Sequence, residues 1–250
     1  MISLPLPPKI IQKNLPAGRQ GKAAIFEIEG LYPGYGVTIG NSLRRVLLSS
    51  LEGASVTSVK IKGVDHEFSS MPGTLEDVIE IIQNVKKIRF KLHGDGPVKL
   101  TLQAKGDKEV KAEDIKLNSD IELINGDQHI VTLTDKKAEF SMEMDVEKGI
   151  GYVPVDQRQK EKLAIGVIAV DAIFSPVKMV NFKVENTRVG QKIDYNKITM
   201  EVETDGSIQP EEAVKKAAEI LVDHFKLISG IEIPEEKTKT AKKSAKKKTK

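Results

Sequence analysis

Residues 34–50, GYGVTIGNSLRRVLLSS, place glycines ahead of a pair of arginines, a combination that fits two kinds of binding chemistry. Glycines between a strand and a helix can cradle nucleotide phosphates, and Gly34 and Gly36 follow an alternating, strand-like run. However, the third glycine of a dinucleotide fingerprint would fall at Ile39, and the neighbouring strands alternate instead of being continuously apolar. The pattern therefore favours an ordinary glycine-rich loop over 30–40, with a nucleotide site kept as an alternative.

The two arginines lie in a short helix that we expect from Asn41, which can cap it, to about residue 50. Four apolar residues share one face of this helix: Leu43, Val46, Leu47 and Leu51. Such a short helix is not stable alone, so this face must be buried. Arg44 borders the face, Arg45 and Leu48 lie beyond it, and Leu48 makes the apolar arc wider than one core needs. A docking surface for another protein and a core helix with two solvated arginines both fit this pattern.

The residue types that commonly carry catalysis or bind metals form no recognisable group. The four histidines are scattered, at positions 66, 93, 129 and 224, and the chain has no cysteine. HEFSS at 66–70 lacks the second histidine of a helical zinc motif, and no G-x-S-x-G nucleophile elbow is present. We therefore expect no catalytic residue, no metal site and no cofactor on this chain.

Alternating apolar and polar runs in the rest of the chain predict a mostly antiparallel β structure with few helices. Short runs between glycines fill residues 94–155, and further strands are expected at 164–174, 180–187 and 197–206. Thr74 and Asp77 resemble a capping box for a helix whose apolar residues follow the helical repeat: Leu75, Val78, Ile79, Ile82 and Val85. These elements together predict the α+β fold class.

The last helix is expected at 210–229, where Pro210 and two glutamates begin it and Gly230 follows it. One apolar stripe runs along it at heptad-like spacing: Val214, Ala217, Ala218, Leu221, Phe225 and Ile228. A second, weaker stripe holds Ala213, Ile220, His224 and Leu227. A helix with two apolar stripes can pack on its own core and on a partner, so we expect self-association through this helix.

The overall composition suits a folded, soluble chain of one large domain or two small ones, because 39% of its 250 residues are apolar. The most apolar stretch, 163–174, is too short to span a bilayer, and the first residues do not resemble a signal peptide. With no cysteine, the composition fits a cytoplasmic location without a membrane partner.

The net charge of +3 conceals a basic end. Residues 235–250 hold eight lysines and two glutamates, a charge of +6, so residues 1–234 carry −3 and offer no basic groove for DNA. We expect this tail to be disordered and, because it lacks aromatic residues, to contact DNA only weakly through charge. The lysines that could make this contact are Lys242, Lys243, Lys246, Lys247 and Lys248.

Several long, ordered motifs carry a resemblance to a known family: GYGVTIGNSLRRVLLSSLEGASVTSVKIKGVDHEF, PGTLEDVIEIIQNVKKI, GYVP, FSPV and VENTRVGQKIDYNKITMEVETDGSIQPEEAVKKAA. They lie between about Ala24 and Ile231. Over this length the chain resembles the amino-terminal domain of the bacterial RNA polymerase alpha-subunit family.

The resemblance implies a discontinuous two-domain fold and a non-catalytic role as an assembly scaffold. Residues 1–52 and 180–234 would form a dimerisation domain, and residues 53–179 an inserted, mostly antiparallel β domain. The homodimer would assemble the beta and beta-prime subunits, which carry the catalytic magnesium site. Contacts between the two copies are implied for Leu43, Leu47, Val214, Ala217, Leu221, Phe225 and Ile228. Contacts with the large subunits are implied for Arg44, Arg45, Leu48 and Lys86.

The sequence departs from the family pattern in three places. Family members usually continue into a small helical domain that touches upstream promoter DNA, whereas this sequence ends in lysines, so we expect it to act without that domain. Gln209 stands where an acidic residue usually precedes the helix proline, and PAGRQG at 16–21 resembles an insertion.

Overall fold

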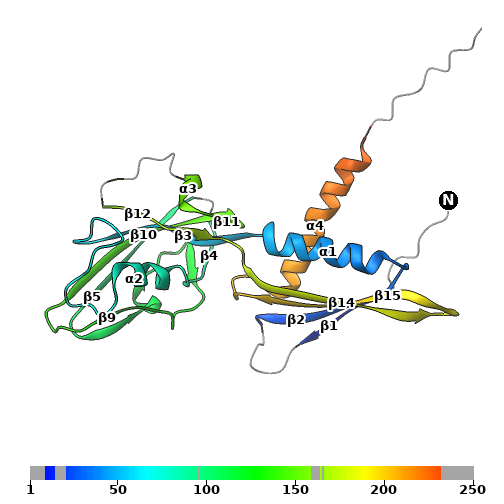
Figure 1. The fold of residues 1–250 in the computed structure, drawn as a ribbon, viewed down its shortest axis with the longest axis horizontal. Coiled ribbons are helices and arrows are strands. Elements are labelled where there is room, and N and C mark those ends of the chain that lie inside the picture. Colours follow the sequence, from blue (N-terminus) through cyan, green and yellow to red (C-terminus); the bar gives the residue numbers. More distant parts are fainter. Residues whose placement is uncertain (1–8, 15–20, 95, 159–163, 165, 232–250) are drawn as a thin grey trace, which may run out of the picture.

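The computed structural model describes residues 9–14, 21–94, 96–158, 164 and 166–231, which form two lobes (Figure 1). The terminal lobe, residues 9–51 and 176–231, contains a four-stranded sheet and two long helices. The central lobe, residues 52–175, contains a seven-stranded sheet and two short two-stranded ladders. Within the described residues every strand pairing is antiparallel, so the predicted α+β class with mostly antiparallel sheets is confirmed.

The sheet of the terminal lobe has the strand order β1-β2-β15-β14. Its strands are β1 (Lys9–Asn14), β2 (Ala23–Leu31), β14 (Val177–Val189) and β15 (Lys192–Thr204). From Asn196 to Thr204, residues of β15 alternate between buried and half-buried positions, which places Ile198, Met200 and Val202 in the core. Two helices pack on that core, α1 (Tyr35–Ser49) and α4 (Pro210–Ser229). The bounds of α4 agree with the predicted helix at 210–229.

The central lobe is organised around the long strand β10, which pairs with β3 on one side and β5 on the other. The sheet has the order β7-β5-β10-β3-β4-β8, and β12 also pairs with β3. Its strands are β3 (Glu52–Ile61), β4 (Phe90–Leu92), β5 (Val98–Lys105), β7 (Ile115–Lys116), β8 (Ile121–Leu123), β10 (Glu139–Ile150) and β12 (Ile168–Ala169). The remaining elements are β6 (Lys108–Lys111) paired with β9 (His129–Leu133), β11 (Tyr152–Val153) paired with β13 (Ala172–Ile173), α2 (Val78–Val85), a 3-10 turn (Ala112–Asp114) and α3 (Val155–Arg158).

Each lobe has its own hydrophobic cluster of buried side chains. The cluster of the terminal lobe joins residues from both ends of the described chain, among them Phe26, Leu43, Leu47, Met200 and Ala217. The cluster of the central lobe draws its buried members only from residues 54–170. Because β2 pairs with β15 along most of its length, the two distant chain segments meet in one sheet.

The lobes meet at a close-packed junction. Gly53 and Phe174 lie in the two chain segments that connect the lobes. A Cβ atom placed on Gly53 would lie 1.8 Å from the Phe174 carbonyl oxygen and 3.5 Å from Cδ of Pro176 in the terminal lobe, so only glycine fits there. Across the same region, Arg89 Nε of the central lobe lies 3.7 Å from Asp205 Oδ2 of the terminal lobe. The Asp205 amide donates a hydrogen bond of 2.9 Å to the Pro176 carbonyl. Packing between the two connecting segments and the largely buried Arg89–Asp205 ion pair therefore hold the lobes together.

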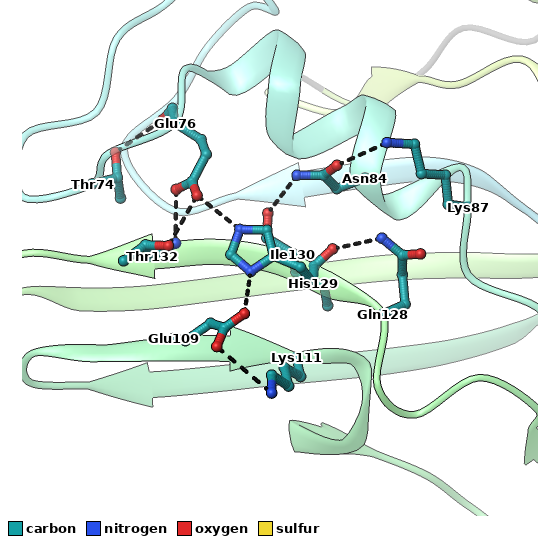
Figure 2. Close-up of polar contacts among 10 residues, drawn as sticks. All are labelled: Thr74, Glu76, Asn84, Lys87, Glu109, Lys111, Gln128, His129, Ile130 and Thr132. Atoms are coloured by element: carbon teal, nitrogen blue, oxygen red, sulfur yellow. Dashed lines mark hydrogen bonds and ion pairs between the residues drawn. The ribbon is translucent and has the colours of Figure 1, made fainter.

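The capping box predicted for the second helix is wrong. Helix α2 begins at Val78, Asp77 makes no side-chain capping bond, and the Thr74 hydroxyl donates to the Met71 carbonyl instead. Leu75, expected on the buried face, is 71% exposed. The physical reason is Glu76, whose carboxylate accepts hydrogen bonds from Thr132 on β9 and contacts His129 (Figure 2). These contacts hold the segment before α2 extended along β9.

The predicted loop over 30–40 is also wrong in part, because α1 already begins at Tyr35. Asn41 therefore lies inside the helix and does not cap it. The Tyr35 amide donates to the Tyr32 carbonyl in the preceding turn, and Gly34 has a φ of 86°, a conformation that glycine adopts without strain. The helix is thus longer than its local capping signals indicate.

Candidate protein interfaces

The arginine pair lies on the exposed side of α1. Leu43, Leu47 and Leu51 are buried in the terminal lobe, as predicted, while Arg44 and Arg45 are exposed. Within the described part of the chain, neither guanidinium forms an ion pair or a side-chain hydrogen bond. Leu48 is half-buried, and its carbonyl accepts a hydrogen bond of 3.1 Å from the Ser175 hydroxyl. The C-terminal end of α1 therefore presents two unpaired cations beside a partly exposed leucine.

The glycines at the start of α1 serve helix packing. A Cβ atom on Gly36 would lie 2.6 Å from Val184 Cγ1, and one on Gly40 would lie 2.7 Å from the Phe182 ring. The backbone amides of Gly34 and Gly36 both donate to Asn196 Oδ1, over 2.9 and 3.2 Å. The amides that a nucleotide phosphate would need are therefore already bonded, which argues against the nucleotide alternative.

Helix α4 has a buried half and an exposed half. Near its start, Ala213 and Ala217 are fully buried, and Val214, Ile220 and Leu221 pack partly against the cluster of the terminal lobe. The distal half of the helix extends away from the sheet (Figure 1). The apolar residues of this distal half are exposed: Val222 (50%), Phe225 (60%), Leu227 (81%) and Ile228 (56%). We call these four residues the distal α4 patch.

The residues implied for contacts between two copies differ in their exposure. Phe225 and Ile228 are exposed, and Val214 and Leu221 are half-buried. Leu43, Leu47 and Ala217 are buried in the core of their own chain, with 6%, 0% and 0% of their surface exposed, and their contact with a second copy stays a prediction. The two predicted stripes of α4 also differ from the structure, since Ala213 of the weaker stripe faces the core together with Ala217.

Lys86 lies on the central lobe, just after α2. Its Nζ atom is 2.8 Å from Asp171 Oδ2, and Asp171 Oδ1 accepts a hydrogen bond from the Val155 amide. The hydrogen bonds from Lys86 and Val155 hold the pKa of Asp171 below its usual value. A groove of about 550 Å³ lies beside this pair, lined in part by Phe68, Ile79, Ile82 and Ile168. Lys86 follows α2 in the central lobe, so it lies on a different lobe from the arginines of α1.

Three other expectations concern the lysine tail, metal binding and the membrane. The lysines of the tail, at 242, 243 and 246–248, lie outside the described residues. Across the ranges that the structure describes, no three His, Cys, Asp or Glu side chains gather as metal ligands. The helices found in those ranges include none that is long and apolar enough to cross a membrane.

Asn196 and the Arg89–Asp205 pair were missed by the sequence interpretation. The Asn196 side chain contacts amides 160 and 162 residues away, so no local pattern points to it. Arg89 follows a helix and resembles any solvated cation in sequence, although only 18% of its side chain is exposed.

Comparison with known proteins identifies relatives along most of the chain. The family model described as "RNA polymerase Rpb3/RpoA insert domain" matches residues 59–175. A protein of Moorella thermoacetica is 53% identical over 206 residues, which cover 82% of this chain and 66% of that protein. One of Carboxydothermus hydrogenoformans is 52% identical over 224 residues, covering 87% and 71%, and one of Symbiobacterium thermophilum is 54% identical over 202 residues, covering 81% and 64%. All three are named "DNA-directed RNA polymerase subunit alpha", and the chain spans about two thirds of their length.

Proposed function

This chain belongs to the family of DNA-directed RNA polymerase alpha subunits, and on that basis we propose that it is the homodimeric assembly scaffold of a bacterial RNA polymerase in the cytoplasm. In this role it binds a second copy of itself and then the beta and beta-prime subunits. It supplies no catalytic residue, metal or cofactor, and nucleotide transfer takes place on the large subunits. DNA is contacted through them, with at most a weak contribution from the lysine tail.

The observation that carries this proposal is the distal α4 patch. Four large or branched apolar side chains are exposed on the distal half of α4, and three of them, Val222, Phe225 and Ile228, share one side of the helix. Burial of apolar surface stabilises by roughly 25 cal/mol for each Å², so a partner that covers this patch gains substantial free energy. A second copy can do so through a two-fold axis, because the same patch then faces itself.

The two separate clusters support the domain division that the family resemblance implies. The resemblance implies a dimerisation domain of residues 1–52 and 180–234 and an inserted domain of residues 53–179. The second boundary differs by a few residues from the lobes described above, because β14 begins at Val177 in the sheet of the terminal lobe. Both α1 and α4 belong to the cluster of the terminal lobe, which therefore fixes the distal α4 patch relative to the arginines.

The arginine pair is the proposed contact for the beta subunit. Arg44 and Arg45 are exposed beside Leu48, and the described chain neutralises neither of them. A partner with carboxylates and apolar side chains would complement this surface. Lys86 would contribute at the groove on the central lobe, where its charge is already paired with Asp171.

Dimer formation can be tested with Phe225→Asp. We expect the variant to be monomeric or aggregated at micromolar concentration, because a charge would be buried without a partner in the interface. Sedimentation velocity measures the outcome. Leu117→Asp is a matched control, since Leu117 is also an exposed apolar residue but lies on the central lobe, and it should leave the dimer intact. A soluble Phe225→Asp dimer would contradict the assignment of α4.

Binding of the beta subunit can be tested with Arg45→Ala. The variant should remain dimeric but bind beta more weakly by about 2–5 kcal/mol, as is typical when a hydrogen-bonded charge is lost from an interface. Calorimetric titration of the dimer with purified beta gives the affinity, and Lys137→Ala serves as a control for loss of an exposed cation. Unchanged affinity of Arg45→Ala would remove this arginine from the binding surface.

A further inference from the structure

The start of α1 is capped by a side chain from a distant part of the chain. The first amides of any helix lack partners within the helix and need an acceptor, which a Ser, Thr, Asp or Asn at the N-cap position usually provides. Here that position is Gly34, which has no side chain. Asn196 on β15 takes its place, because its Oδ1 atom accepts hydrogen bonds from the Gly34 and Gly36 amides over 2.9 and 3.2 Å.

The strand that carries Asn196 is irregular at this point. The pairing of β15 with β2 shifts register between Asn196, opposite Leu31, and Ile198, opposite Ile28. Tyr195 and Asn196 are both buried, although successive residues of a regular strand face opposite sides. Such an irregularity redirects a side chain, and here it allows the Asn196 amide group to reach the helix. Its Nδ2 atom also donates to Asn186 Oδ1 on β14 over 3.3 Å, which holds the amide group in orientation.

Other contacts fix α1 along the rest of its length. Gly36 and Gly40 allow the helix to lie close against Val184 and Phe182 of β14. At the other end, the Ser175 hydroxyl donates to the Leu48 carbonyl. These contacts fix the middle and the C-terminal end of α1, and the bonds to Asn196 fix its start.

We propose that Asn196 is a positioning residue for the large-subunit contact: as a remote cap of α1, it sets the start of the helix and thereby the placement of Arg44 and Arg45. The inference rests on the proposed function, because it assumes that these arginines bind a large subunit. Without the Asn196 cap, the first turn of α1 would open, and the helix would begin nearer to Asn41, which can cap it locally.

Two measurements on the dimer test this proposal with Asn196→Ala, Asn196→Asp and Asn181→Ala. The first is amide hydrogen exchange of peptides that cover residues 35–41, and the second is affinity for purified beta subunit. Asn196→Ala should exchange roughly fivefold faster in this segment, the effect of losing one N-cap, and should bind beta several-fold more weakly. Asn196→Asp keeps the acceptor, and the Asn186 amide group can turn and donate to the new carboxylate, so both values should stay close to those of the unmodified dimer. Asn181→Ala removes an exposed asparagine from β14 and should change neither.

Several results would overturn the proposal. Unchanged exchange at residues 35–41 in Asn196→Ala would show that the cap does not hold the helix start. Faster exchange with unchanged affinity for beta would reject the positioning role. If Asn196→Ala does not fold, Asn186→Ala tests the same proposal, because it removes only the support of the Asn196 amide group and should produce the same effects at smaller size. If the unmodified dimer does not bind beta at all, the proposed function fails. The exchange measurement still tests separately whether Asn196 caps α1.

Discussion

The Glu76 side chain is only 13% exposed, and its carboxylate makes three polar contacts with β9. The Thr132 amide and hydroxyl donate to it over 2.7 and 3.0 Å, and His129 Nε2 lies 2.7 Å away (Figure 2). Burial alone would raise the pKa of Glu76, but the hydrogen bonds from Thr132 and His129 outweigh it and hold the pKa below 4.5, its ordinary value. The ionised carboxylate therefore stabilises the fold.

The sign of this effect leads to a prediction for Glu76→Gln. Because the pKa is lowered in the folded state, the stabilisation is present above pH 4.5 and is lost as the pH falls through the folded-state value. At pH 7 the free energy of unfolding of the variant should be about 1–3 kcal/mol lower than that of the unmodified protein. Between pH 5 and 3 its free energy of unfolding should depend less on pH. Urea unfolding at several pH values measures both, with Glu80→Gln, an exposed glutamate of α2, as the control. If the stability of Glu76→Gln depends on pH in the same way as that of the unmodified protein, the proposed role of Glu76 is wrong.

Single residues were predictable from sequence only where helical geometry decides their exposure. The position of Arg45 beyond the apolar face of a helix predicts its exposure, and the structure confirms it. The contacts of Asn196 with Gly34, of Glu76 with His129 and of Lys86 with Asp171 were not predictable, because the two partners of each contact lie 53 or more residues apart along the chain. No local sequence pattern predicts such pairs.

Among the elements, α1 depends on close approach to β14. Gly36→Ala combines two opposing effects, since alanine favours a helix by about 1 kcal/mol over glycine, whereas overpacking costs about 1–3 kcal/mol. The new Cβ atom would lie 2.6 Å from Val184 Cγ1 and 3.0 Å from Asn196 Cβ, so we expect the clash to dominate. The free energy of unfolding should fall by about 1–2 kcal/mol.

Chemical denaturation measures this change, and Gly94→Ala provides the control because nothing lies within 4 Å of a Cβ atom there. An increase in stability for Gly36→Ala would mean that helix propensity dominates and that α1 does not lie as close to β14 as the structure indicates.

Element boundaries were predictable where the start and stop signals are local. Pro210 and Gly230 bound α4 within the chain itself, and the prediction agrees with the structure. The starts of α1 and α2 were wrong because tertiary contacts decide them: Asn196 caps the first, and Glu76 holds the segment before the second against β9. Period-two alternation was sufficient to identify strands such as β5, where Val98, Leu100 and Leu102 are buried.

At the scale of the whole molecule, the proposed function requires two binding surfaces at a fixed separation, one on each lobe. The arginines of α1 lie on the terminal lobe, and Lys86 lies on the central lobe. Which distant strands share a sheet could not be derived from alternation, and the two-domain arrangement was inferred from the family resemblance. The junction at Gly53, Phe174 and the Arg89–Asp205 pair is therefore the feature on which the relative orientation of these surfaces depends.

Arg89→Met is expected to loosen that orientation. Methionine keeps much of the length of the side chain but leaves the Asp205 carboxylate, 7% exposed, without its cationic partner. Because the chain has no cysteine, spin labels can be placed at Lys137→Cys on the central lobe and Lys215→Cys on α4, and labelled protein diluted with unlabelled protein reports distances within one chain. The distance distribution should broaden in Arg89→Met, and the free energy of unfolding should fall by about 1–3 kcal/mol. Lys87→Met, which removes the adjacent exposed charge, is the control and should leave the distance distribution narrow. An equally narrow distribution in Arg89→Met would show that the backbone packing around Gly53 is sufficient to fix the two lobes.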